Sequence, residues 1–155
     1  MENHKKWMRK AIDMAKEGMS SKGGGPFGAV IVKNGSLVAA AHNRVSATQD
    51  CTQHAELYTI QLACEVLGTK NLSDCILYTS CEPCMMCLGA SYWAGFKKIF
   101  YGVSADKAKE YGFIYSDMFY NSNSGKRHKE FKLQQLLEEE ALSVFKTYKE
   151  KQDVK

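Results

Sequence analysis

The sequence predicts a single three-layer α/β domain whose sheet is covered by helices on both faces. A length of 155 residues and a hydrophobic content of 45% are typical of one globular domain with a real core. Two strands in a hairpin come first, and strands then alternate with helices along the chain. The helical crossovers favour parallel pairing among the strands that follow the hairpin.

The first predicted elements are an amphipathic helix and the hairpin. Residues 4–18 carry apolar side chains at helical spacing. The glycines and proline at 23–26 then predict a loop. Residues 27–33 and 37–42 are apolar runs on either side of Asn34-Gly35, a strong short-range signal for a hairpin.

The remaining elements follow from apolar spacing and from glycine and proline positions. The helix over 55–67 ends at Gly68, and Pro83 opens the helix over 84–94 because proline favours the first helical turn. The other predicted elements are a strand over 75–79, a strand over 98–101 ended by Gly102, a short helix over 107–111, a polar loop over 121–125 and a long charged helix over 133–149.

Composition and charge exclude several classes of protein. No repeat, low-complexity tract or linker is present, so we expect one domain over residues 1–155. The net charge of +4 is mild for a nucleic-acid binder, and the basic C-terminal residues alternate with glutamates, as on a solvated helix face. No apolar run approaches the roughly 20 residues that cross a bilayer, and no signal sequence is evident. We therefore expect a cytoplasmic protein without a membrane partner.

The six cysteines indicate metal or catalytic chemistry and not disulfides. Cys81, Cys84 and Cys87 recur every three residues, which is too close for bridges among themselves. The scattered cysteines are interpreted as small buried apolar residues, the usual role of a free thiol; these are Cys51, Cys64 and Cys75.

A catalytic zinc site is predicted from His54, Cys84 and Cys87. Zinc binds imidazole nitrogen and thiolate sulfur, and a catalytic site has three protein ligands and one open position. Two cysteines three residues apart at a helix start lie about one turn apart, and the helix N-terminus favours their thiolate form. Glu56, two residues after the histidine, would stand beside the bound water as a proton acceptor and donor.

Two alternatives for the cysteines remain open at this point. A structural zinc site needs a fourth ligand, which Cys81 would supply. A bacterial ferredoxin motif needs a fourth cysteine followed by proline, and the chain has Ser91-Tyr92 there. The His-x-Glu element at 54–56 favours the catalytic interpretation.

The combination of His54-Ala55-Glu56 with Pro83-Cys84-Met85-Met86-Cys87 is the signature of zinc-dependent nucleobase deaminases. With the stretches 24–32 and 77–90, it resembles the cytidine deaminase superfamily over about residues 4–113. Within that superfamily the motifs are most similar to those of bacterial guanine deaminases, with tRNA adenosine deaminases and fungal cytosine deaminases as more distant relatives.

The resemblance implies a cytidine-deaminase-like α/β/α fold with a central mixed sheet of about five strands. It implies a homodimer in which about residues 114–155 form a specificity and dimerisation segment. The implied site consists of zinc on His54, Cys84 and Cys87, Glu56 as proton shuttle, and substrate contacts from Asn43, Phe27 and the backbone of Ala55.

The implied activity is hydrolytic release of ammonia from a purine base or a similar small aminated heterocycle, with guanine to xanthine as the best single choice. A tRNA-specific adenosine deaminase would share the catalytic residues and use the basic tail on RNA phosphates. A cytosine or nucleoside deaminase is a further alternative. A zinc-stabilised binding module without activity is the non-enzymatic alternative, and Glu56 argues against it.

One segment departs from the guanine deaminase pattern. Those enzymes carry Gly-Phe-Asp-Asp, where an acidic residue hydrogen-bonds to the base, and this chain has Gly112-Phe113-Ile114-Tyr115. Either Asp117 takes over the acidic role or the substrate has changed. For Phe27 and Trp93, stacking on a flat ring and ordinary core packing are both open.

Overall fold

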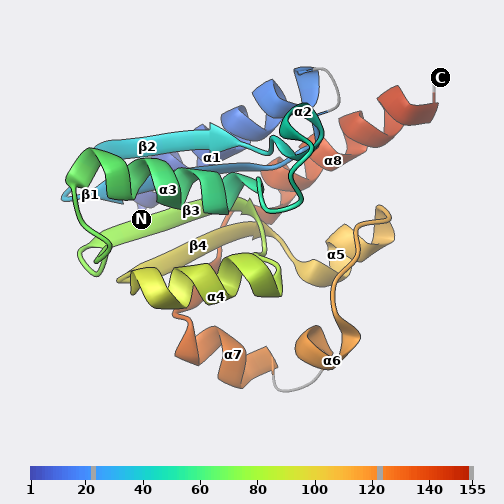
Figure 1. Ribbon diagram of the computed structural model, residues 1–155. Coiled ribbons are helices and arrows are strands. Elements are labelled where there is room, and N and C mark those ends of the chain that lie inside the picture. The colour runs from blue at the N-terminus through green and yellow to red at the C-terminus, as the bar shows by residue number, and fades with distance from the viewer. Residues whose placement is uncertain (22–23, 122–123, 154–155) are drawn as a thin grey trace.

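A five-stranded mixed sheet lies at the centre of the computed structural model, which describes residues 1–21, 24–121 and 124–153 (Figure 1). The spatial order is β2-β1-β3-β4-β5. β1 pairs antiparallel with both β2 and β3, whereas β3, β4 and β5 run parallel, as predicted for the strands after the hairpin. The strands are β1 (Gly28–Lys33), β2 (Ser36–His42), β3 (Cys75–Cys81), β4 (Lys98–Val103) and β5 (Leu133–Gln135).

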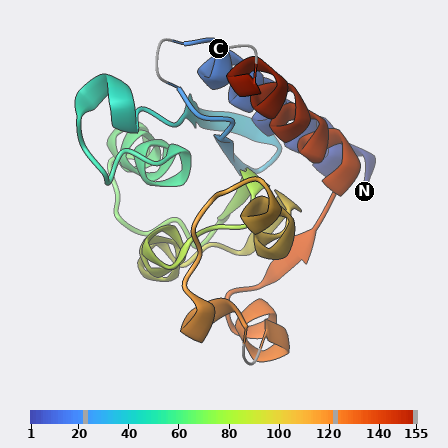
Figure 2. The same ribbon diagram turned by 90° about the vertical axis from the view of Figure 1, so that its right-hand side faces the viewer.

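Helices cover both faces of this sheet, which confirms the three-layer prediction. α1 and α8 lie side by side on one face, and α3 and α4 lie on the other (Figures 1 and 2). The smaller helices extend from the edge of the sheet. The helices are α1 (Glu2–Ser20), α2 (Val45–Thr48), α3 (Ala55–Leu67), α4 (Met85–Ala94), α5 (Ala105–Glu110), α6 (Asp117–Tyr120), α7 (Ser124–Glu130) and α8 (Glu138–Asp153).

Strand alternation produces two cores, one under each helical layer. Successive side chains of a strand point to opposite faces, so Val30 packs beneath α1 and α8 while Ile31 packs beneath α3. The turn at Asn34-Gly35 sets this register: both residues have positive φ, 49° and 76°, as a two-residue type I′ hairpin requires.

The C-terminal region differs from the prediction. A short strand, β5, and the helix α8 replace the single helix expected over 133–149, because Lys132 and Leu137 adopt left-handed backbone conformations that interrupt it. Parallel pairing with β4 and burial of Leu133 stabilise the strand. α7 occupies part of the region expected as a loop over 121–125; residues 122–123 of that loop, like residues 22–23 near the predicted glycine loop, lie outside the described residues.

The strand predicted to end at Gly102 continues to Val103 as β4. Its pairing with β3 extends to Cys81 opposite Val103. Gly102 suits this position because a Cβ there would lie 2.5 Å from Cβ of Ala141, so the missing side chain lets α8 approach the sheet.

All six cysteines are free, in agreement with the prediction of no disulfides. Cys75 is buried and Cys64 is half-buried, but Cys51 is exposed, so its assignment to the core is wrong. Cys51 lies in the turn between α2 and α3, away from both cores.

No helix among the described residues is long and apolar enough to span a membrane.

Gly28 permits the closest contact between β1 and α1. A Cβ at this position would lie 2.3 Å from the carbonyl oxygen of Ala11 and 2.4 Å from the nitrogen of Ala15, which are backbone atoms that cannot rotate away. We expect Gly28→Ala to lower the free energy of unfolding by about 1–3 kcal/mol, as overpacking does, measured by urea denaturation.

Gly89 provides the matched control for that substitution. It lies within α4, and a Cβ there meets nothing within 4 Å. Gly89→Ala should leave stability unchanged or raise it by about 0.5–1 kcal/mol through higher helix propensity. Equal stability of the two variants would contradict the proposed close contact.

Candidate metal centre and substrate pocket

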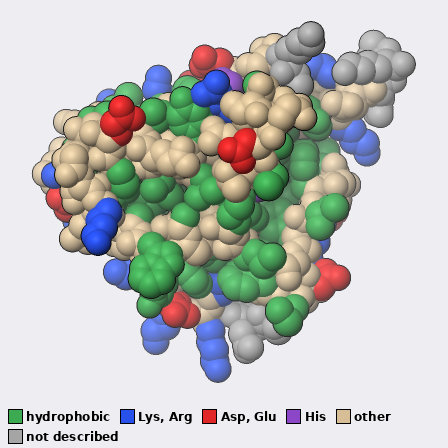
Figure 3. All heavy atoms as spheres, in the orientation of Figure 1, with side chains coloured by type: hydrophobic (Ala, Val, Ile, Leu, Met, Phe, Trp, Pro, Cys, Tyr) green, Lys and Arg blue, Asp and Glu red, His purple; other side chains and the backbone are tan. Residues whose placement is uncertain are grey.

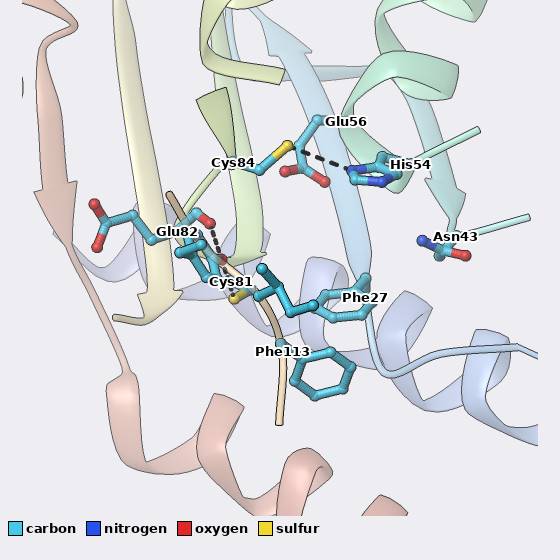
Figure 4. Close-up of a pocket in the computed structure, with 10 residues that line it drawn as sticks. Phe27, Asn43, His54, Glu56, Cys81, Glu82, Cys84 and Phe113 are labelled. Atoms are coloured by element: carbon cyan, nitrogen blue, oxygen red, sulfur yellow. Dashed lines mark hydrogen bonds between the residues drawn. The ribbon is translucent and has the colours of Figure 1, made fainter. Parts of the chain in front are cut away.

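Three potential metal ligands converge at the N-terminal ends of two helices. His54 is the N-cap of α3 and Cys84 is the N-cap of α4, with Cys87 in the first turn after it. Nδ1 of His54 lies 3.5 Å from the sulfur atoms of both cysteines, and the three ligand atoms lie within 4.8 Å of one another; Figure 4 shows the contact between His54 and Cys84. One imidazole nitrogen and two sulfurs are a donor set that suits zinc.

The sheet and the helix caps bring these ligands together. β3 ends at Cys81, and a turn of two residues leads to Cys84. α3 covers the same face of the sheet as α4, and its N-cap His54 lies beside Cys84 at the end of that turn. The N-terminal ends of both helices face the group, and the positive end of a helix dipole favours thiolate over thiol.

The electrostatics of the group favour a thiolate at Cys84 and a proton-carrying carboxyl at Glu56, whereas the hydrogen bond with Cys84 and burial raise the pKa of the Cys87 thiol. The thiol of Cys87 and the ring of His54 hydrogen-bond to Cys84 and lower the pKa of its thiol to about 4, which makes it a thiolate at neutral pH. Burial, with the nearby Cys84 thiolate, raises the pKa of the Glu56 carboxyl to about 7. Glu56 is therefore able to accept and release a proton near neutral pH.

A cavity of about 170 Å³ opens beside this group. That volume equals the share of roughly six water molecules, which suits one small ring system. The lining residues come from the loop before β1, the end of β2, the end of β3, the starts of α3 and α4, and the segment after α5; they are Phe27, Asn43, His54, Glu56, Cys81, Glu82, Cys84, Phe113, Ile114 and Tyr115.

Two of the predicted substrate contacts line this pocket. The side-chain oxygen of Asn43 accepts a hydrogen bond from the backbone nitrogen of Val45, which leaves its NH₂ group as the donor for a ligand. Phe27 packs edge-on against Phe113, with ring centroids 4.9 Å apart, and the two rings form an apolar wall. Ala55 is fully buried at the first position of α3, between His54 and Glu56.

Two other predicted residues lie away from the pocket. Asp117 is 85% exposed and forms an ion pair with Lys109 at 3.4 Å, so its position gives no support to a contact with the base. Ser116 caps α6 by accepting a hydrogen bond from Phe119, and this cap places Asp117 at the exposed start of the helix. Trp93 is 86% exposed on α4 and borders a different hollow.

Cys81 takes part in a different interaction from the other two cysteines of the cluster. Its sulfur lies 3.0 Å from the hydroxyl of Tyr115, and it is outside the group formed by His54, Cys84 and Cys87. Burial raises the pKa of the Cys81 thiol well above its usual range, so it stays protonated. The hydroxyl of Tyr115 donates to the carbonyl of Glu82.

Sequence reasoning did not identify Tyr115, Ile114 or Glu82 as pocket residues. The sequence offered one signal for these residues, the departure from Gly-Phe-Asp-Asp at 112–115. That departure indicated a segment that differs from guanine deaminases, but not which residues it contacts. Glu82 lines the pocket through its position in the turn, and its carboxylate points away from the cavity (Figure 4).

Comparison with known proteins places these residues in a family context. The model for the cytidine and deoxycytidylate deaminase zinc-binding region matches residues 1–103. The chain is 44% identical to guanine deaminase of Bacillus subtilis over 147 residues, which cover 95% of this chain and 94% of that protein. It is also 42% identical to the tRNA-specific adenosine deaminase of Bacillus subtilis, over 62% of this chain and 59% of that protein.

The fold is also similar to that of solved structures. The crystal structure of NE0047 in complex with 2,6-diaminopurine superimposes with a TM-score of 0.82 and 27% sequence identity, over 94% of this chain and 80% of that chain. This similarity extends through the C-terminal region, where the family model does not match.

Proposed function

The chain belongs to the cytidine and deoxycytidylate deaminase family, and we propose that it is a zinc-dependent enzyme that hydrolyses guanine to xanthine and ammonia. The observation that carries the proposal is the grouping of His54, Cys84 and Cys87 beside the buried carboxyl of Glu56, at a pocket whose volume suits one small ring system.

His54, Cys84 and Cys87 would hold the zinc ion. The donor set fits because it supplies one imidazole nitrogen and two sulfurs, and the low pKa of Cys84 makes its sulfur a thiolate. Three ligands leave one position for a fourth partner. When bound, zinc would supply the Lewis acidity that makes a water molecule nucleophilic near neutral pH.

Glu56 would move the protons of the reaction. Its carboxylate would accept a proton from the attacking water and deliver it to the ring nitrogen next to the amino-bearing carbon. Glu56 would then pass the second proton of the same water, from the hydroxyl added to that carbon, to the amino group, which leaves as ammonia while the carbon becomes a carbonyl. A carboxyl pKa of about 7 suits both directions of transfer, because neither protonation state is strongly favoured at neutral pH.

Asn43, Phe27 and the backbone of Ala55 are the proposed substrate contacts. The NH₂ group of Asn43 would donate to an acceptor of the ring, and Phe27 would contribute an apolar surface. We also propose that residues 114–155 contain the specificity determinants, because Ile114 and Tyr115 line the pocket.

Guanine is favoured over tRNA as the substrate because the chain aligns with a guanine deaminase over more of its length than with a tRNA-specific adenosine deaminase. The guanine deaminase relative aligns along 95% of the chain, whereas the tRNA-specific relative aligns along 62%.

The decisive experiment measures ammonia release by the zinc-loaded protein from guanine, guanosine, adenine, cytosine and a tRNA anticodon stem. We expect guanine to be the substrate. Glu56→Gln should lower kcat by about 10²–10⁴-fold because it removes the proton carrier, while metal content stays at the wild-type value. Turnover of another substrate with guanine inert, or full activity of Glu56→Gln, would refute the proposal.

The cysteine cluster permits a direct test of the ligand assignment. Cys84→Ala and Cys87→Ala should each lose most of the bound zinc, because two ligands do not form a stable catalytic site. Cys81→Ala is the matched control and should keep one zinc per chain, measured by inductively coupled plasma mass spectrometry, because its sulfur contacts Tyr115 instead. Loss of zinc in the control would indicate a four-ligand site.

We propose that the protein works as a homodimer. Hydrophobic side chains gather on the face that carries α3 and α4 (Figure 3), and the exposed ones on these helices include Val66, Met85, Tyr92 and Trp93. Sedimentation equilibrium should give twice the mass of the chain, and Trp93→Lys should shift the distribution towards the monomer. A monomeric wild type would contradict this proposal.

A further inference from the structure

A buried ion pair connects α7 to the turn that carries Cys84. Nη2 of Arg127 lies 3.2 Å from Oε2 of Glu82, and the two residues are only 8% and 4% exposed. They are 45 positions apart in the chain. Burying two charges costs desolvation energy that their attraction often does not recover, so stability alone is a weak explanation for the pair.

Both charged groups make further directed contacts. Oε1 of Glu82 accepts a hydrogen bond from the backbone nitrogen of Ala105 at 3.0 Å. Nη1 of Arg127 donates to the carbonyl of Phe119 at 2.8 Å, and its guanidinium stacks 4.5 Å from the ring centroid of Tyr120. Arg127 therefore contacts both Glu82, in the turn that leads to Cys84, and the helix α6.

The same segment is attached to the turn at two more points. The hydroxyl of Tyr115 donates to the carbonyl of Glu82, and the hydroxyl of Tyr120 donates to the carbonyl of Pro83. These two carbonyls directly precede Cys84. The contacts therefore place residues 113–115, which form one wall of the pocket, against the turn that carries a proposed zinc ligand.

We propose that Arg127 is a positioning residue for substrate binding. Through Glu82 and α6 it holds the wall formed by Phe113, Ile114 and Tyr115 at a fixed distance from the metal centre, so that the pocket is already shaped before the base enters. This inference rests on the proposed function in that the pocket is taken as the substrate site. Arg127 touches neither the pocket nor the ligand group, and acts through the wall.

The test compares Arg127→Met with Arg9→Met in steady-state ammonia release. Methionine keeps much of the length of arginine and removes the charge and the donors. In the wild type, nearly all molecules should have the pocket in its binding shape. If Arg127→Met lowers that fraction to about one tenth, KM should rise about tenfold. Because the backbone nitrogen of Ala105 still holds the Glu82 carboxylate, the turn that carries Cys84 should stay in place, and kcat should stay within about a factor of three of wild type.

Arg9 is the matched control because it forms the same type of pair elsewhere. Its Nε and Nη2 atoms contact the two carboxylate oxygens of Glu140 at 3.0 and 3.1 Å, linking α1 to α8. That pair is exposed and distant from the pocket, so Arg9→Met should leave KM unchanged.

A second readout does not depend on catalysis. Cys81 is buried beneath the wall and contacts Tyr115, so loosening the wall should expose its thiol. The zinc-loaded proteins are treated with 5,5′-dithiobis(2-nitrobenzoic acid), and peptide mass spectrometry follows Cys81 separately from the exposed Cys51. Cys81 should be labelled faster in Arg127→Met than in wild type or Arg9→Met.

Arg127→Lys keeps the test valid if Arg127→Met does not fold. The amino group of lysine restores the charge but cannot contact Glu82 and Phe119 simultaneously as the guanidinium does. The KM of Arg127→Lys should therefore lie between the values for wild type and Arg127→Met. The proposal is overturned if the Arg127 variants lose activity as lower kcat at unchanged KM, or if Cys81 labelling equals that of Arg9→Met. If the wild type deaminates no base, the proposed function fails, and the labelling rates still decide the positioning role.

Discussion

The convergence of three ligand atoms within 4.8 Å is the constraint on which the arrangement of this protein depends. His54 and Cys84 are both N-caps, so their side chains project from helix starts whose positions are set by the sheet. A shift of one residue in the register between β1 and β3 would turn the core side chains of one strand to the opposite face of the sheet. The hairpin turn at Asn34-Gly35 and the close approach at Gly28 hold β1 against β2 and α1, and so support the sheet on which both helix starts are placed.

Burial of Glu56 links this geometry to chemistry. A carboxyl that stays near its ordinary pKa is almost fully ionised at neutral pH and is a poor proton donor. Packing Glu56 into the first turn of α3, beside the Cys84 thiolate, raises its pKa to about 7. The same helix supplies His54, so one turn of backbone positions a metal ligand and a proton carrier together. The unfavourable burial of the acid is offset by the packing of α3 against β1 and β2.

Apart from the short helix α2, which the sequence analysis did not predict, the elements up to β4 were predictable because their signals are local. Apolar spacing identified α1 and α3, and glycine in the left-handed conformation ends α3 at Gly68 as expected. The region after Gly102 was predicted less well. The segment around β5 has a helical composition, yet parallel pairing with β4 and the burial of Leu133 outweigh that propensity. Asp117 was expected at the pocket from its type and approximate place, but the cap by Ser116 puts it at the exposed start of α6.

The sequence by itself determined the candidate chemistry: His54, Glu56, Cys84 and Cys87 are recognisable from residue type and spacing, because metal ligation and proton transfer each require particular atoms. The tertiary structure alone decided the shape of the pocket. Ile114 and Tyr115 reach it, Cys81 turns to Tyr115, and Arg127 pairs with Glu82 from 45 positions away. Hydrogen bonds between distant segments have no periodicity along the chain, so their partners become identifiable only when folding brings the segments together.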